Sequence, residues 1–277
     1  RILKFVPASG AASRMFKNLY EFLSASYDVP TSDFEKKFFS EITRFAFYNA
    51  LNAVCLANEE KDIPALIAAG NYKAVVFNLL DAKGLNYGQL PKGLLLFHRA
   101  GETIRTAMEE HLAEGAMYAK NNAGEVNIHF TVSPEHKALF EQLVSEKKQA
   151  YEEKFSVGYD LSFSVQKPST DTVAADMENN PFRDKNGKLL FRPGGHGALI
   201  ENLNDIDADV VFVKNIDNVV PDSFKCSTVI FKKVIAGVLV TLQERIFNYL
   251  NLIETGKYSH DQVEEMIHFL QDDLCIK

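Results

Sequence analysis

The sequence predicts an α/β protein with a mostly parallel, mixed sheet and helices on both faces of that sheet. Two observations lead to this fold class. Short apolar runs alternate with helical stretches along most of the chain, and several of the apolar runs end in small or polar residues. This alternation is typical of sheets built from strand–helix–strand units. Ligands of such sheets bind beyond the carboxyl ends of the strands, so the residues that follow each run are the candidates for function.

Six apolar runs are predicted to be strands. They are residues 2–6, 94–97, 127–132, 161–165, 189–191 and 210–214. Helices are predicted between them at residues 102–119, with an amphipathic pattern, at 135–153 and at 198–203. Their lengths and their alternation with the runs favour one doubly covered sheet.

Two regions depart from this alternation. Residues 33–80 have helical periodicity, and we expect a helical insertion, a subdomain or lid, over about 31–88 of an α/β domain that covers 1–221. A simple pair of packing helices explains the pattern equally well. Residues 222–277 are helical again, at 229–253 and 261–274. The chain starts at Arg1 without a methionine and enters a predicted strand at once, so we expect a fragment whose helical C-terminal segment belongs to a longer chain.

The composition is that of an ordinary globular protein, with 277 residues, 46% hydrophobic and 24% charged. The net charge of −7 argues against nucleic acid as a partner. Cys55, Cys226 and Cys275 have no metal-ligand spacing, and we expect buried free thiols. No run approaches the ~20 apolar residues of a membrane span, and no signal peptide is apparent. These observations predict a cytoplasmic protein without a membrane partner.

The first candidate site is the stretch "FVPASGAASRMF", residues 5–16. A predicted strand ends in a turn of small residues, and a predicted helix follows with Arg14 near its start. Such a turn can bring backbone N–H groups close to a phosphate, and Gly10 permits backbone conformations that other residues resist. The forked guanidinium of Arg14 suits phosphate oxygens. An ordinary tight turn is the alternative.

Two further candidates are a lysine and a glutamine next to predicted strands. In "LPKG", Pro91 and Gly93 flank Lys92, which could reach a nucleotide site as a compact charge or be simply solvated. Gln166 follows the run 161–165, and its amide offers a donor and an acceptor to a base edge. A plain turn rich in Ser and Thr would look similar.

The last two candidates are a glycine-rich loop and an aspartate. In "FRPGGHG" three glycines surround His196, a composition that favours close approach of a ligand over a simple turn. In "FVKNIDN" Asp217 follows a hydrophobic strand, between Asn215 and Asn218. Mg²⁺ takes one or two protein carboxylates and fills its shell with phosphate and water, so Asp217 is a natural ligand for it. The alternative is that Asp217 caps the next segment.

The order of these five stretches resembles the UTP–sugar-1-phosphate uridylyltransferases, that is, the UDP-glucose and UDP-N-acetylhexosamine pyrophosphorylases. It is most similar to a bacterial family of unassigned function that is related to them. The resemblance covers Ile2 to about Pro221, and "PGGHGALI" and "FVKNIDN" are its most specific parts. It implies the nucleotide-diphospho-sugar transferase fold.

The resemblance also implies a role for each candidate. Arg14 and Lys92 would be the catalytic cations at the phosphates, and Asp217 would bind Mg²⁺. The nucleotide-binding residues would be those along the nucleotide and those that hold uracil: Ala8, Ser9, Gly10, Gln166, Gly195 and His196.

The implied activity is Mg²⁺-dependent formation of a UDP-sugar and pyrophosphate from UTP and a sugar 1-phosphate. Two rivals share the fold. A glycosyltransferase with a UDP-sugar donor would normally carry Asp-x-Asp, which "NIDN" lacks. A UDP-sugar-binding protein without turnover is favoured by Ala11 and Ala12, which stand where the family loop is richer in glycine. We expect their Cβ atoms to push a triphosphate outward.

Overall fold

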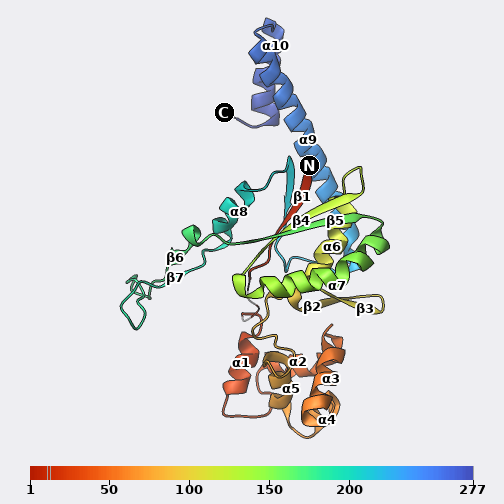
Figure 1. The fold of residues 1–277 in the computed structure, drawn as a ribbon, viewed down its shortest axis with the longest axis vertical. Helices are drawn as coiled ribbons and strands as arrows, with labels where there is room; N and C mark the ends of the chain where they lie inside the picture. Colours follow the sequence, from red (N-terminus) through yellow and green to blue (C-terminus); the bar gives the residue numbers. More distant parts are fainter. Residues whose placement is uncertain (11, 13, 277) are drawn as a thin grey trace. The chain divides into compact units, whose positions relative to one another are not determined.

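The computed structural model describes residues 1–10, 12 and 14–276, without the side chain of His196. The chain forms two compact units, Arg1–Lys225 and Cys226–Lys277. The first contains the sheets and helices α1–α8, and the second is helical (Figure 1). All of the candidate site residues belong to the first unit.

The main sheet of the first unit has four parallel strands in the order β5-β4-β1-β8. Their bounds are β1 Ile2–Pro7, β4 Glu125–Val132, β5 Gly158–Val165 and β8 Val210–Val213. In chain order the strands lie third, second, first, fourth, which is the order of the first four strands of a dinucleotide-binding sheet. The α/β class with a parallel sheet is therefore confirmed, and the arrangement is compatible with a Rossmann-like fold.

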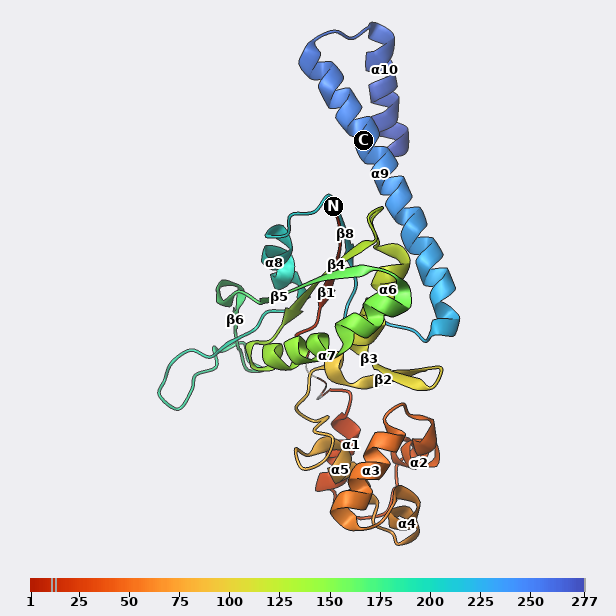
Figure 2. The same ribbon diagram turned by 45° about the vertical axis from the view of Figure 1, so that its right-hand side comes forward.

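Helices cover both faces of this sheet (Figure 2). On one face, Val6 of β1 and Phe130 of β4 pack in a core with α6 (Ala107–Tyr118) and α7 (Lys137–Phe155). On the other face, Leu3 and Phe5 pack against residues in and next to α8 (Ile200–Asn204). Side chains alternate between the faces along β1, so one strand serves both cores.

Two predicted strands lie outside the main sheet. Residues 92–94 form a 3₁₀ turn, and β2 (Leu96–Ala100) pairs antiparallel with β3 (Thr103–Thr106). The second, β7 (Phe191–Arg192), pairs antiparallel with β6 (Thr172–Val173) in a hairpin arm. Over the described residues the main sheet is thus purely parallel rather than mixed, because each of these short runs pairs with a local partner.

The predicted helix 102–119 begins later than expected. Gly101, with φ +67°, and Glu102 connect β2 to β3 in a two-residue hairpin turn, a position that favours glycine. Helix α6 then starts after Thr106, which forms a capping box with Glu109. The Thr-x-x-Glu pattern is a start signal that marks the true boundary.

The polar residues of α6 are buried, so the predicted amphipathic pattern does not face solvent. Glu114 accepts hydrogen bonds from Lys214 with both oxygens at 2.8 Å. It also accepts from Lys4 of β1 at 3.3 Å and from the Tyr118 hydroxyl at 3.3 Å. This single carboxylate therefore joins α6, the first strand and the end of the last strand.

A second buried carboxylate of α6, Glu110, joins it to the end of the first unit. Glu110 pairs with Lys225 and, at 3.4 Å, with Arg105. Both cations also bond to Asp222, each at 2.7 Å. The segment after β8 is therefore fixed to the same helix as β8 itself.

Five helices lie between β1 and β2, and the helical character of residues 33–80 is confirmed. Their bounds are α1 Lys17–Ser24, α2 Asp33–Ser40, α3 Tyr48–Glu59, α4 Ile63–Ala68 and α5 Tyr72–Leu80. They share a core of buried apolar side chains that includes Phe22, Leu51 and Val75. Residues on both sides of this segment, Phe16 and Leu95, belong to the same core.

The second unit is a helical hairpin. Helix α9 (Lys225–Thr255) is followed by α10 (His260–His268) and a π-helical turn (Phe269–Asp273). The Tyr249 hydroxyl donates to Glu265 at 2.7 Å, and Arg245 pairs with Asp273 at 2.6 Å. The predicted helices 229–253 and 261–274 are thus present.

The expectation of buried thiols holds for one cysteine in three. Cys55 is buried in the helical core, whereas Cys226 and Cys275 are exposed. Apolar neighbours in the sequence predicted burial for all three. Cys226 and Cys275, however, lie on helical-unit surfaces that the described residues leave uncovered.

The helical segment Asp222–Thr255 is long and apolar enough to cross a membrane, by length and composition alone. None of its most apolar stretch is buried. The expectation that no run approaches this length is therefore wrong. The uninterrupted apolar run is short, but the helix around it remains apolar on average over the length of a membrane span. Core helices of soluble proteins share this composition but are mostly buried, whereas this stretch is not, and the location of the protein stays a prediction.

Replacing Glu114 with Gln should strongly destabilise the first unit. The side chains of Glu114 and Lys4 are fully buried and that of Lys214 nearly so, and the change removes the negative charge that both ammonium groups bond to. Loss of one partner in such a network costs about 3–5 kcal/mol of unfolding free energy, measurable by urea denaturation. Glu141→Gln breaks only an exposed pair with Lys137 and should cost less than about 1 kcal/mol. Equal effects of the two changes would contradict the role of Glu114.

Candidate functional site

Several of the predicted site residues follow three strands that end at one edge of the main sheet. Gln166 follows β5, Ala8–Gly10 follow β1, and Lys214–Asp217 follow β8. Adjacent strands lie about 4.8 Å apart, so this edge measures roughly 14 Å from β5 to β8. The strand order reverses next to β1, and this switch point is where α/β sheets bind their ligands.

Three of the predicted motifs meet beside β1. The Lys92 N–H donates to the Gly10 carbonyl at 3.2 Å, which joins "LPKG" to the opening loop. The Lys92 ammonium forms an ion pair with the Asp217 carboxylate. The side chains are 23% and 38% exposed, so both remain accessible from solvent. Segments far apart in the sequence thus form one charged cluster at the switch point.

The opening loop is fixed at its start and open at its end. Ala8 is buried, and its N–H donates to the Thr131 carbonyl of β4 at 2.8 Å. Ser9 is half-buried and Gly10 is exposed, with open space where a Cβ would lie. Gly10 does not have a positive φ, so the conformational reason given for this glycine is wrong.

Arg14 lies in a turn and not at the start of a helix. The Met15 N–H donates to the Ala12 carbonyl at 2.8 Å, and α1 begins only at Lys17. The Arg14 side chain is exposed. Ala12 is fully buried in the core of the insertion helices, so its methyl group cannot push a triphosphate outward, contrary to expectation. Ala11 lies outside the described residues.

Two predicted base-binding segments pack against each other. The Gln166 amide donates to the Thr170 hydroxyl at 3.2 Å. A Cβ on Gly194 would lie 2.8 Å from the Thr170 carbonyl oxygen and 3.5 Å from the Gln166 Nε2 atom, so only glycine fits there. Gly195 is exposed with open space in front of it. The side chain of His196 lies outside the described residues.

A polar network behind Gln166 contains residues that the sequence did not single out. Asn202 of α8 is buried and donates to the Val165 carbonyl and the Ser164 hydroxyl, both at 2.9 Å. The His129 ring nitrogens lie 2.8 Å from the hydroxyls of Ser162 and Ser164. This network holds the end of β5 against α8. The signal in the sequence was that Asn202, a polar residue, lies on the apolar side of a short helix.

Residues of α6 fix the position of the loop that carries Asp217. Lys214, at the loop's start, is bound by Glu114, and the Ile216 N–H donates to the Pro7 carbonyl at 3.1 Å. The His111 Nε2 atom lies 3.1 Å from the Ile216 carbonyl oxygen. Burial lowers the pKa of His111 well below its ordinary value, and the nearby Lys4 lowers it further. His111 is therefore neutral and donates to the loop.

The donor set suits a metal ion that arrives with phosphate. Over residues 1–10, 12 and 14–276 there is no group of three or more His, Cys, Asp or Glu placed to hold a metal. Asp217 supplies one half-exposed carboxylate at the switch point. That is a poor site for a resident metal but fits Mg²⁺, which takes most of its ligands from phosphate and water.

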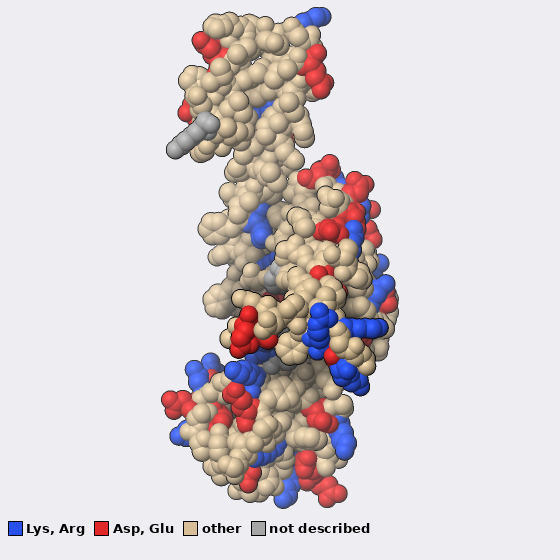
Figure 3. Space-filling view, turned by 90° about the vertical axis from the view of Figure 1, so that its left-hand side faces the viewer, with Lys and Arg blue, Asp and Glu red and all other residues tan. Residues whose placement is uncertain are grey.

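The surface charges of the described residues are mixed in sign on the face seen in Figure 3. Lys and Arg side chains alternate there with Asp and Glu, without one continuous basic area. This pattern is in line with the net charge of −7. The absence of a nucleic-acid partner stays a prediction.

The chain is similar to a protein family. The model of the family described as "Domain of unknown function (DUF4301)" matches residues 1–277. No curated protein and no solved structure matches the chain.

The stability of the first unit should fall as the pH drops below about 6.5. Burial lowers the pKa of both His111 and His129, so below the ordinary histidine pKa the unfolded chain binds protons that the folded chain does not. His111, whose pKa lies well below its ordinary value, then removes about 1.4 kcal/mol of unfolding free energy per pH unit, and His129 acts in the same direction. Urea unfolding between pH 7.5 and 5.0 measures this slope.

His111→Gln keeps a donor for the Ile216 carbonyl but does not titrate. It should therefore reduce the slope of unfolding free energy against pH by about 1.4 kcal/mol per pH unit, the contribution of one proton. A His111→Gln slope equal to that of the wild type would contradict the assignment.

Proposed function

The chain belongs to the DUF4301 family, and we propose that it is a nucleotidyltransferase that forms a UDP-sugar and pyrophosphate from UTP and a sugar 1-phosphate. The observation that carries this proposal is the meeting of three motifs at the switch point. Lys92 bonds through its backbone to Gly10 and through its side chain to Asp217. The sequence resemblance assigns Gly10 to the nucleotide, Lys92 to the triphosphate and Asp217 to the metal ion.

In the proposed complex the nucleotide lies along the carboxyl edge of the sheet. Gln166 and Gly195, with His196, hold uracil beyond β5, where an amide and open backbone are available. The phosphates pass over Ala8, Ser9 and Gly10 beyond β1. Arg14 and Lys92 contact the phosphates from the two segments that flank the insertion helices. The proposed base-binding groups beyond β5 and the phosphate-binding groups beyond β1 thus follow the order of base and phosphates along UTP.

The proposed reaction is an in-line displacement at phosphorus. An oxygen of the sugar 1-phosphate forms a bond to the α-phosphorus of UTP, and the bond from that phosphorus to the bridging oxygen of the β-phosphate breaks. Pyrophosphate leaves with the electron pair. Arg14 and Lys92 offset the developing negative charge, and positioning supplies much of the rate, so no side-chain nucleophile is required.

Mg²⁺, held by Asp217 and the phosphates, would neutralise phosphate charge when bound. Without nucleotide, Lys92 and Asp217 neutralise each other. If Asp217 held a cation that arrives with the nucleotide, its carboxylate would no longer be neutralised by Lys92, and the Lys92 ammonium would be available to a phosphate oxygen. The pair thus keeps two oppositely charged groups in place until substrate separates them. The proposal includes a cytoplasmic location and no nucleic-acid or membrane partner.

Incubation with UTP, Mg²⁺ and a panel of sugar 1-phosphates should release pyrophosphate in step with UDP-sugar formation. CTP, ATP and GTP should react far more slowly, because a site that hydrogen-bonds one base edge leaves its polar groups unpaired with another. Asp217→Asn should lower turnover by orders of magnitude with little change in melting temperature. Asp207→Asn, an exposed aspartate before β8, is the matched control.

Two results would overturn this assignment. Sugar transfer from a ready-made UDP-sugar without pyrophosphate release would identify a glycosyltransferase. Tight binding of UDP-sugar with no product in either assay would identify a binding protein. Wild-type turnover by Asp217→Asn would remove this residue from the site.

Arg14→Ala should weaken UTP binding far more than uridine binding, because only UTP presents phosphates to the guanidinium. Charge-assisted hydrogen bonds of this kind contribute about 1.5–3 kcal/mol, roughly ten- to a hundredfold in affinity. Arg14→Lys should restore only part of the loss, since an ammonium cannot make the paired contact. Calorimetry with both ligands measures the difference.

The control is Arg44→Ala, which removes an exposed arginine next to α2 that pairs with Glu41. It should leave the affinity for UTP unchanged. An equal cost of Arg14→Ala to UTP and to uridine would mean that the opening loop is only a turn.

A further inference from the structure

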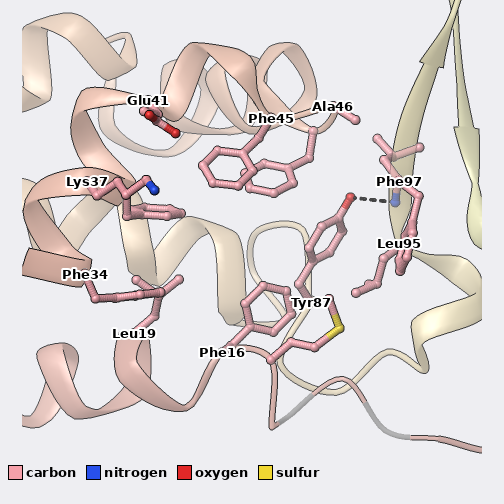
Figure 4. Close-up of a pocket in the computed structure, with 14 residues that line it drawn as sticks. Phe16, Leu19, Phe34, Lys37, Glu41, Phe45, Ala46, Tyr87, Leu95 and Phe97 are labelled. Atoms are coloured by element: carbon pink, nitrogen blue, oxygen red, sulfur yellow. Dashed lines mark hydrogen bonds between the residues drawn. The ribbon is translucent and has the colours of Figure 1, made fainter. Parts of the chain in front are cut away.

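A cavity of about 500 Å³ lies among the insertion helices, the opening turn and the start of β2. Its walls are almost entirely apolar and rich in phenylalanine (Figure 4). Phe16, Leu19 and Phe47 are buried at its inner walls, and Phe34 and Phe45 are 41% and 36% exposed at its rim. This volume and lining are those of small-molecule sites in proteins. None of the nucleotide-binding or metal-binding candidates lines it.

The polar groups of the cavity are few, and two of them are already satisfied. The Tyr87 hydroxyl accepts a hydrogen bond from the Leu96 N–H at 3.2 Å. Glu41 pairs with Arg44 at 3.1 Å. Tyr87 therefore offers an apolar ring to the cavity, and the charge of Glu41 is compensated outside it.

Lys37 is the remaining charge at the cavity. It lies on α2 among the lining residues, and Figure 4 shows its ammonium turned toward the aromatic side chains. Among the described residues, no carboxylate lies within ion-pair distance of this ammonium. Lys37 is exposed, so its ammonium lies at the solvent-facing side of the apolar cavity. A cation in that position is a recognition element for an anion attached to an apolar body.

We propose that this cavity binds a small amphiphilic anion, whose apolar ring or chain fills the phenylalanine-lined space while its carboxylate, sulfonate or phosphate pairs with Lys37. The site is separate from the proposed nucleotide site and does not depend on it. Apolar burial supplies most of the affinity, and Lys37 selects anions over neutral molecules of the same shape. The rim phenylalanines are exposed when the cavity is empty and become covered by the ligand.

The test uses two fluorescent probes with the same ring system. 8-Anilinonaphthalene-1-sulfonate carries an anionic group, and N-phenyl-1-naphthylamine lacks it. The full chain should bind the anion more tightly. Lys37→Gln should weaken binding of the anionic probe by about two- to fivefold, the effect of an ion pair at an exposed site, and leave binding of the neutral probe unchanged. Lys36→Gln, the neighbouring exposed lysine outside the cavity, should change neither probe.

The cavity itself is tested by filling it. Ala46→Leu places extra carbon atoms in the space and should weaken both probes, with circular dichroism to check the fold. Phe45→Ala, at the exposed rim, should also weaken both probes without burial of new atoms. Binding of the probes to other apolar surfaces, such as that of α9, is unaffected by these changes. The difference in probe binding between each variant and the wild type therefore reports on the cavity alone. Unchanged binding in both variants, or an equal effect of Lys36→Gln and Lys37→Gln on the anion, would overturn the proposal.

Discussion

The ionised carboxylate of Glu114 is the interaction on which the arrangement of the site depends. Burial alone would raise the pKa of Glu114, but Lys4 and Lys214 outweigh this effect and hold the pKa below its ordinary value. Conversely, the two lysines can stay buried only while this carboxylate is charged. Lys4 belongs to β1 and Lys214 follows β8, so the ion network connects the two strands whose carboxyl ends form the switch point.

A buried ion network is weak evidence for net stability, but it can specify one arrangement over others. A slip of β1 by one residue would turn Lys4 to the opposite face, away from Glu114, and move Leu3 into its place. Glu110, one turn earlier in α6, applies the same constraint to Lys225 after the sheet ends. Helix α6 therefore fixes β1, β8 and the segment beyond β8 in one register. The loop with Asp217 lies between two of these fixed points.

The sequence predicted those parts whose signals are local. Strands β1, β4, β5 and β8 stand out because apolar runs end in turn residues, and α7 because its periodicity is long. Helix α6 was misread because its buried acids resemble a solvated face, and their partners Lys4 and Lys214 lie about a hundred residues away in the chain. Among the residues of the candidate site, Lys92 and Asp217 could be predicted because each stands in a sequence motif. Asn202 and Lys214 were missed, because an asparagine in a short helix and a lysine after a strand occur in many other contexts.

The loop at the far end of the hairpin arm between β6 and β7 is a position at which the chain can tolerate an insertion. The arm's base pairs Val173 with Phe191, and the Gln166 and Gly194 segments pack together next to that base. Its far end is exposed, with Gly187 at φ +77° in a turn after Asp184. Doubling the length of a flexible loop raises the entropic free-energy cost of closing it by only about 0.6 kcal/mol. A reporter domain or an epitope inserted at this turn would therefore leave the sheet edge intact, and natural variation in length is best tolerated there.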